Sequence, residues 1–465
     1  MFGTIELPLW LLVLVLGFAG VTFASHFLFP SVRWFFRKWA ERAVARINKR
    51  LDRPIEPFKL ARRQDMIVRL TYDRQVLEAV SEHAAEAGIP GSVAFEEARR
   101  YAREIVPGFS ATLYFGFAIR AARRLSRALY RVRIGKVDVA LANFDPKATV
   151  IFVMNHRSNM DYVLVTWLVA NRSAISYAVG EWARVWPLSA MIRAMGAYFI
   201  RRGSRNTLYR RVLARYVQMA TDAGTTQAIF PEGGLSLDGR LGQAKMGLLS
   251  YIYAGFDPKT DRDVIFVPVG LAYDRVLEDR LLTEVQGEGT RRFRAKPWSI
   301  AAFTARMVWR MIRGRFAGFG TAAAGFGAPV SLRGFLAETA DPTTEALGVR
   351  LMAEIAKVVP ILPVPLVAAA LAGGGQDRAA LRARMGEIAE QLVSGQAVLK
   401  LPPQGLDVAL NEGLTPLLAR GIVIEGPDGL QVPTKAQALL AFYAAPVWQV
   451  LRAAPALINA ATQQT

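Results

Sequence analysis

Hydrophobic and polar positions change their spacing several times along this chain. An uncharged apolar stretch covers residues 7–29, and residues 60–135 follow with apolar side chains three or four positions apart, as in amphipathic helices. Residues 136–340 then alternate short apolar runs with helical segments, and the remainder is mostly helical around a turn-rich hairpin at 422–432. The pattern divides the chain into four regions: 1–30, 31–135, 136–340 and 341–465.

Five short runs within the third region have the β-branched and aromatic character of strands. Amphipathic helices, such as the one around residues 209–220, separate several of them. Strands that alternate with helices predict an α/β fold, with a layered mixed or parallel sheet flanked by helices. The predicted strands are residues 149–154, 174–179, 197–200, 227–230 and 264–269.

Three polar turns each follow one of these strands. They lie at residues 155–161, 201–203 and 231–234. In open α/β sheets, ligands bind beyond the carboxyl ends of the strands. We therefore expect the three turns to converge on one site at this edge of the sheet.

The first turn places a histidine five residues before an aspartate. On an uninterrupted helix, His156 and Asp161 would point about 140° apart. If Ser158 or Asn159 caps a new helix, Asp161 falls in its first turn and can reach back to the imidazole. This is a general base with its orienting carboxylate, and a substrate hydroxyl would be the nucleophile. Two alternatives remain open: a metal site that adds Glu232, and a purely structural histidine.

Other polar residues around the three turns are suited to binding an anionic substrate. Guanidinium groups contact phosphates through two parallel hydrogen bonds, and paired glycines allow a ligand to approach the backbone. Glu232 could hold an arginine or a substrate hydroxyl. The candidates are Arg157, Ser158, Arg201, Arg202, Glu232, Gly233, Gly234, Ser236, Arg240 and Lys245.

Composition supports a negatively charged partner. The net charge of +20 fits nucleic acid, anionic lipid or a phosphorylated substrate. The chain contains no cysteine, which excludes disulfides, thiolate metal sites and cysteine nucleophiles. Residues 7–29 are long enough to span a bilayer as an uncleaved anchor, and only Glu6 precedes them as a charge. The alternative is a buried hairpin helix of a soluble protein.

Residues 33–53 favour the membrane interpretation, because eight basic side chains are interleaved there with aromatic ones. They predict that the body of the protein lies on the cytoplasmic side. A basic amphipathic segment at 291–319 either rests on the bilayer or packs on the sheet. The proline-rich apolar run at 358–372 is too short for a typical span and is expected to be buried or interfacial. The charged residues 96–104 are expected to form a solvated helix face.

Four blocks in this order make the chain resemble the glycerolipid acyltransferases. Residues 156–161 match the His-x4-Asp block of that family, and residues 196–202, ending in Phe-Ile-Arg-Arg, match the second. Residues 230–236 and 267–270 are similar to the third and fourth. The context His-Arg-Ser-x-x-Asp-Tyr resembles the glycerol-3-phosphate acyltransferase branch. One residue departs from the pattern, because Leu235 stands where the third block commonly has an arginine.

The resemblance implies a mechanism without metal or redox cofactor. His156 would remove a proton from the acceptor hydroxyl, which attacks a fatty acyl thioester, while Asp161 orients the imidazole. Arg240 or Lys245 could replace the missing arginine. The resemblance assigns phosphate binding to Arg201, Arg202 and Arg157, the shape of the acceptor pocket to Glu232, Gly233 and Ser236, and the lining of the site to Pro268.

The resulting expectation is an O-acyltransferase of the inner membrane, with its catalytic domain on the cytoplasmic face. It would acylate the sn-1 hydroxyl of glycerol 3-phosphate to lysophosphatidate, the first step of phospholipid synthesis, and would not bind nucleic acid. The donor would be acyl-CoA or acyl carrier protein. A lysophosphatidate or other lysophospholipid acyltransferase is the nearest alternative, and a non-catalytic scaffold that binds anionic lipid is the alternative from another class.

Overall fold

A computed structural model describes most of the chain. It covers residues 53–135, 145–169, 173–180, 188–201, 203–288, 318–372, 377–427 and 429–462, with scattered positions before 52 and between 307 and 316. Residues 55–465 form one compact unit, and residues 1–54 form another. The predicted anchor at 7–29 and most of the segment at 291–319 lie outside the described residues. None of the helices in the described part of the chain combines the length and apolar character needed to cross a bilayer.

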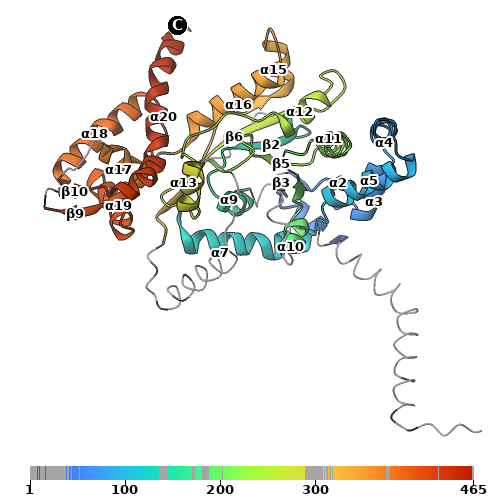
Figure 1. The fold of residues 1–465 in the computed structure, drawn as a ribbon, viewed down its shortest axis with the longest axis horizontal. Coiled ribbons are helices and arrows are strands. Elements are labelled where there is room, and N and C mark those ends of the chain that lie inside the picture. The colour runs from blue at the N-terminus through green and yellow to red at the C-terminus, as the bar shows by residue number, and fades with distance from the viewer. Residues whose placement is uncertain are drawn as a thin grey trace, which may run out of the picture. The chain divides into compact units, whose positions relative to one another are not determined.

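A mixed sheet with mostly parallel pairing lies at the centre of the larger unit (Figure 1). Its order is β1-β7-β6-β2-β5-β3-β4, with β8 also beside β6. Strand β6 pairs antiparallel with β7 and β8, and every other pair is parallel. The strands are β1 (Arg131–Ile134), β2 (Thr149–Met154), β3 (Ser176–Gly180), β4 (Tyr198–Ile200), β5 (Gln227–Ile229), β6 (Val264–Tyr273), β7 (Thr321–Phe326) and β8 (Val330–Ser331). All five predicted strands are confirmed, and β6 continues four residues beyond its predicted end at 269.

Strand β7 was missed because its residues are small. It reads Thr-Ala-Ala-Ala-Gly-Phe and lacks the branched side chains that indicate a strand. The structure explains this composition, since a Cβ on Gly325 would lie 2.1 Å from the Val358 carbonyl oxygen of the helix packed above. Pro268 is tolerated inside β6 because it lies between the residues that pair with β8 and those that pair with β7.

Both faces of the sheet are covered by helices, and β2 shows the division. Val150, Phe152 and Met154 belong to one core, whereas Ile151 and Val153 belong to the other. Helices α11 (Thr207–Asp222), α12 (Gly247–Ala254) and α16 (Thr344–Val358) contribute to the second core. Helix α9 (Met160–Leu168) contributes to the first, and α7 (Ile119–Leu129) packs on α9. This two-sided burial holds β2 and the turn that follows it firmly in place.

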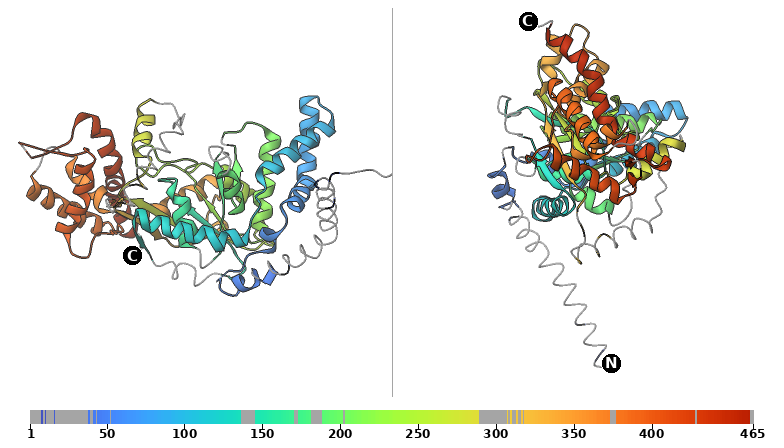
Figure 2. Two further views of the ribbon diagram at one scale, coloured as in Figure 1. Left: turned by 90° about the horizontal axis from the view of Figure 1, so that it is seen from below. Right: turned by 90° about the vertical axis from the view of Figure 1, so that its left-hand side faces the viewer.

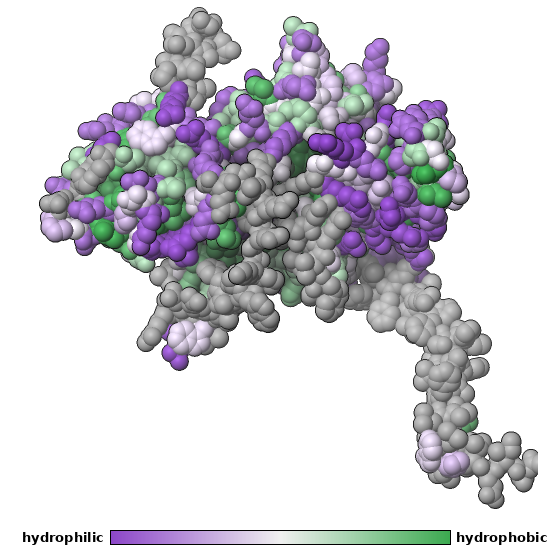
Figure 3. Space-filling model, viewed as in Figure 1, coloured by the Kyte–Doolittle hydropathy of each residue, from purple (hydrophilic) through white to green (hydrophobic). Residues whose placement is uncertain are grey.

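The N-terminal helices lie at one end of the sheet (Figures 1 and 2). In the view of Figure 3 their surface is mostly hydrophilic, with a smaller hydrophobic patch at the outer edge. Helix α5 buries its alanines together with Tyr101 and Ile105, so its opposite side faces solvent. This group comprises α2 (Pro57–Leu60), α3 (Arg63–Thr71), α4 (Arg74–Ala87), α5 (Gly91–Ile105), α6 (Ala111–Leu113) and the π-helix η1 (Tyr114–Ala118).

The C-terminal helices gather at the opposite end around α17 (Pro363–Leu371) (Figures 1 and 2). Every residue of α17 is buried, which confirms the prediction of a buried segment rather than a span. It contacts α18 (Arg378–Ser394), α19 (Leu406–Ala419) and α20 (Gln437–Thr462). The predicted hairpin forms as β9 (Ile424–Gly426) and β10 (Gly429–Gln431). The remaining elements are α10 (Leu188–Ala194), α13 (Asp279–Glu288), α15 (Leu332–Glu338) and the short helix η3 (Thr434–Ala436).

Candidate active site

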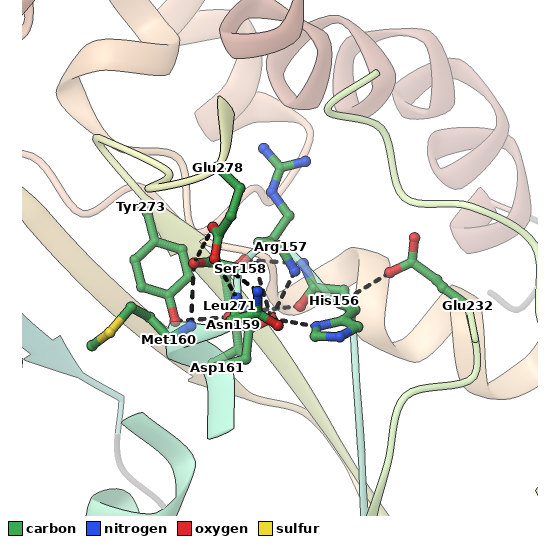
Figure 4. A network of polar contacts seen from close by, with 11 residues as sticks. His156, Arg157, Ser158, Asn159, Met160, Asp161, Glu232, Leu271, Tyr273 and Glu278 are labelled. Carbon is green, nitrogen blue, oxygen red and sulfur yellow. Dashed lines mark hydrogen bonds and ion pairs between the residues drawn. The ribbon is translucent and has the colours of Figure 1, made fainter. Parts of the chain in front are cut away.

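The turn after β2 brings His156 and Asp161 together (Figure 4). Asn155 fixes the start of this turn, because its side chain both donates to and accepts from the backbone of Leu271 in β6. Helix α9 then begins at Met160, so Asp161 lies in its first turn and reaches back, as the spacing predicts. The His156 Nδ1 and Asp161 Oδ2 atoms are 2.9 Å apart, and both side chains are buried.

The Asp161 carboxylate accepts more than the imidazole hydrogen bond. The backbone N–H groups of Arg157 and Ser158 donate to Oδ2 at 2.7 and 3.1 Å, and the Tyr273 hydroxyl donates to Oδ1 at 2.7 Å. Burial raises the pKa of Tyr273, and the nearby Asp161 charge raises it further, so the phenol stays protonated and donates. These donors stabilise an ionised Asp161, which in turn requires a hydrogen on His156 Nδ1.

The other imidazole nitrogen is left available for chemistry. None of the described residues makes a hydrogen bond to His156 Nε2. The ring stacks on Phe230 at a centroid distance of 4.2 Å and meets the Tyr162 ring edge-on at 5.4 Å. The aromatic neighbours and Asp161 together hold the ring in one orientation.

The turn after β5 is joined directly to His156. The His156 N–H donates to Glu232 Oε1 at 2.8 Å, and the His156 carbonyl accepts from the Ser236 N–H at 3.0 Å. Glu232 also accepts from the Gly242 N–H at 2.9 Å through its other oxygen. Burial raises the pKa of Glu232, while these backbone hydrogen bonds act in the opposite direction. The expected convergence of the first and third turns is therefore confirmed.

Arg157 lies in the turn but faces away from the imidazole (Figure 4). Its guanidinium donates to the Gly239 carbonyl and lies over the Phe442 ring, 5.3 Å from the centroid. The side chain is buried, and burial lowers its pKa. In this structure Arg157 connects the turn after β5 to helix α20.

Arg201 is held by a carboxylate that the sequence placed on a solvated face. Its guanidinium makes two hydrogen bonds to Glu104, at 2.8 and 2.6 Å, between the rings of Tyr101 and Tyr209. Glu104 is only 12% exposed, so the prediction of a solvated face was wrong for this residue, because α5 turns it toward β4. Arg202 lies outside the described residues.

The second turn is farther from His156 than the third. Arg201 follows β4, which is the third strand from β2 in the sheet order. At the usual strand spacing this separation is roughly 14 Å. Arg201 therefore shares an edge with His156 without contacting it, and any group that it binds lies well away from the imidazole.

The glycine pair makes room for a lysine. Gly233 has φ +64°, and a Cβ there would lie 3.0 Å from Cδ of Lys245, so the lysine side chain runs across the glycine. Gly234 follows in the same turn. The Ser236 hydroxyl donates to the Arg240 carbonyl at 2.7 Å, while the Arg240 side chain is 58% exposed.

Pro268 occupies a different surface from the histidine turn. It pairs in register with Val153 on the face covered by α16, and a Cβ on Gly327 would lie 3.2 Å from its ring. Its proposed lining of the site stays a prediction.

Glu278 was not predicted, although it holds the turn that contains His156. It accepts from the Ser158 hydroxyl at 2.8 Å and from the Asn159 backbone and side-chain N–H groups at 3.2 and 3.0 Å. Burial raises its pKa, and these hydrogen bonds oppose the shift. Tyr273 was missed as well. Tyr273 and Glu278 both lie beyond residue 269, where the last predicted strand ended. A prediction that extended this strand to its observed end at Tyr273 would have pointed to both residues. Among the described residues, no group of three histidine, aspartate or glutamate side chains is arranged to hold a metal ion.

Comparison with known proteins identifies the domain that contains this site. Residues 136–272, from before β2 to near the end of β6, match the acyltransferase family. The matched segment makes up less than a third of the chain. All four sequence blocks lie within the matched segment, as do His156, Asp161 and Glu232.

The proteins that this chain resembles over most of its length are longer than it is. A glycerol-3-phosphate acyltransferase of Haemophilus influenzae (strain PittEE) is 27% identical over 376 residues, covering 76% of this chain and 44% of the relative. Proteins of the same name from Shewanella sp. (strain ANA-3) and Pseudomonas entomophila (strain L48) are 29% and 27% identical, covering 64% and 67% of this chain and 36% and 39% of those proteins. The chain thus spans less than half the length of these relatives.

A solved structure also matches part of the chain. The 1-acyl-sn-glycerophosphate acyltransferase of Thermotoga maritima is 19% identical, and the match covers 63% of this chain and 97% of that one with a TM-score of 0.31.

Proposed function

We propose that this protein is a glycerol-3-phosphate acyltransferase that forms lysophosphatidate from glycerol 3-phosphate and a fatty acyl thioester. The buried His156–Asp161 pair, with Nε2 left without a described partner, is the observation that carries the reaction class. The names of the relatives support glycerol 3-phosphate as the acceptor. The donor is acyl-CoA or acyl carrier protein.

The proposed step uses no protein nucleophile. The sn-1 hydroxyl gives its proton to His156 Nε2 as its oxygen attacks the thioester carbonyl. The tetrahedral intermediate then collapses, the carbon–sulfur bond breaks, and the thiolate leaves and takes up the proton from the imidazolium. Asp161 stabilises this imidazolium and keeps Nδ1–H pointing at itself. No metal or redox cofactor is needed to balance the step.

Acceptor binding is proposed to involve the third turn and the positive charges around it. The turn after β5 contains Gly233 and Gly234, and it contacts His156 through Glu232. The Lys245 side chain runs across Gly233 in the same turn. Arg201, fixed by Glu104, is positioned to contact a distant anionic group rather than the reacting hydroxyl. Arg202, Ser158, Ser236, Arg240 and Pro268 remain proposed contributors to the pocket.

An acceptor panel tests the proposal. The purified full chain would be given radiolabelled acyl-CoA or acyl carrier protein together with glycerol 3-phosphate, lysophosphatidate or glycerol. We expect labelled lysophosphatidate as the main product. A preference for lysophosphatidate as acceptor would replace this function with that of a lysophospholipid acyltransferase, and no transfer to any hydroxyl would support the lipid-binding scaffold.

We further propose that the protein works on the cytoplasmic face of the inner membrane, and the surface of α7 supports contact with a bilayer. Its inner side, Ala122, Ser126 and Leu129, is buried, and α7 packs on α9. Its outer side combines exposed apolar side chains with a strip of arginines, the composition of helices that lie on anionic bilayers. The exposed residues are Phe117, just before α7, and Arg120, Arg123, Arg124, Leu125 and Arg127.

A single cysteine can report this contact, because the natural chain has none. An environment-sensitive fluorophore on Leu125→Cys should shift to the blue in vesicles that contain phosphatidylglycerol, and brominated lipid should quench it. The same label on Val393→Cys, which is 63% exposed on α18, serves as the control and should keep its aqueous spectrum. Identical aqueous spectra at both positions in every vesicle would contradict contact through α7.

A further inference from the structure

The C-terminal helix α20 contacts the loop that contains the third sequence block. Gln449 accepts from the Leu241 N–H at 2.7 Å and donates to the Leu241 carbonyl at 2.9 Å. Two residues earlier in the loop, Gly239 has φ +81° and lies against α20. A Cβ on Gly239 would be 1.9 Å from the Phe442 carbonyl oxygen. Two points of α20 therefore hold the same loop.

This loop has no helix or strand of its own between β5 and α12. It is fixed instead by contacts at both of its sides. On the inner side, Glu232 and Ser236 bind the two backbone groups of His156, and Glu232 also binds the Gly242 N–H. On the outer side, Gln449 binds the residue directly before Gly242. A displacement at Leu241 would thus pass to Glu232 and to the backbone of His156.

We propose that Gln449 is a positioning residue, which holds the 232–242 loop against the histidine turn through its paired hydrogen bonds to Leu241. This proposal rests on the proposed acyl transfer for its effect on turnover, but the loop contact itself does not depend on that activity. Helix α20 thereby becomes part of the active-site framework, although it lies outside the segment that matches the family.

The chemistry of the amide explains why glutamine suits this position. Leu241 presents one backbone donor and one acceptor, and only a side chain with both functions can satisfy them together. An ionised glutamate would keep the hydrogen bond from the N–H and repel the carbonyl. A leucine of similar size would make neither hydrogen bond.

Cleavage by trypsin after Arg240, the residue before Leu241, measures the loop contact without any substrate. The Gln449→Leu variant should be cut there about tenfold faster than the wild type, the change expected from losing one or two hydrogen bonds. Cleavage after Arg378, an exposed residue at the start of α18, should keep its rate. The rate of cleavage after Arg240 in Gln449→Glu should lie between those of the wild type and Gln449→Leu. Gln437→Leu changes an exposed position at the start of α20 and is the matched control, which should be cut at the wild-type rate.

Turnover is the second measurement on the same proteins. Gln449→Leu should lower kcat/KM for glycerol 3-phosphate by about tenfold, with Gln449→Glu recovering part of the loss and KM for the acyl donor unchanged. Unchanged cleavage after Arg240, or faster cleavage with unchanged turnover, would overturn the positioning role. If the wild type transfers no acyl group to any acceptor while cleavage of Gln449→Leu is still accelerated, the proposed function fails and the hold of Gln449 on the loop stands.

Discussion

Replacement of His156 by alanine should reduce acyl transfer by a factor of about 1,000 or more, since general-base catalysis and substrate alignment are both lost. Nε2 is the proposed proton acceptor. In the part of the chain that the structure describes, the other imidazole is that of His83, which pairs with Glu97 in the N-terminal helices. The measurement is the initial rate of radiolabelled lysophosphatidate formation at saturating donor and acceptor.

His83→Ala provides the matched control for this substitution. It removes a half-buried histidine that also contacts a carboxylate, and it should leave turnover within about twofold, as expected for a residue remote from the site. Circular dichroism would establish that both variants are folded. An active His156→Ala protein would rule out the proposed base and favour a structural histidine.

Substitution of Asp161 by asparagine should lower kcat by about 100- to 10,000-fold, because a neutral amide no longer stabilises the imidazolium or selects the Nδ1–H tautomer. It should also destabilise the fold by about 1–3 kcal/mol. The reason is that His156, two backbone N–H groups and Tyr273 all donate to this carboxylate, and the amide NH2 would face donors. Single-turnover rates and denaturant unfolding would measure the two effects separately.

Asp341→Asn is the control for the change of charge, since Asp341 is exposed at the start of the segment before α16. Its turnover and unfolding free energy should match those of the wild type. If Asp161→Asn retained full kcat and lost only stability, the aspartate would be a structural partner of the turn and would have no part in orienting the base.

Much of the framework could be read from the sequence. The β-branched run at 149–154 is β2 itself, and the helix begins late enough after it for Asp161 to reach His156. The apolar run with three prolines was predicted to be buried or interfacial rather than a membrane span, and it forms the buried helix α17. Patterns of this kind depend on residues close together in the chain, so local spacing is sufficient to identify them.

The parts that failed depend on distant partners. Alanine-rich β7 is a strand only because β1 and β6 lie on either side of it, and small side chains fit beneath α16. Glu104 appeared as one more charge on a helix face, yet it forms the bidentate contact to Arg201 from 97 residues away. Arg157 has the side chain of a phosphate ligand, but the C-terminal helix and Gly239 determine where it points.

The alternation of strands and helices and the pairing of His156 with Asp161 follow from local sequence, because these two residues are five positions apart and need only one turn to meet. The residues around this pair depend on the tertiary structure. Glu232, Tyr273 and Glu278 reach the turn from 76 to 120 residues away, and Gln449 reaches its loop from 208 residues away. Such contacts follow from the order of the strands and the packing of the C-terminal helices, which no local pattern of side chains specifies.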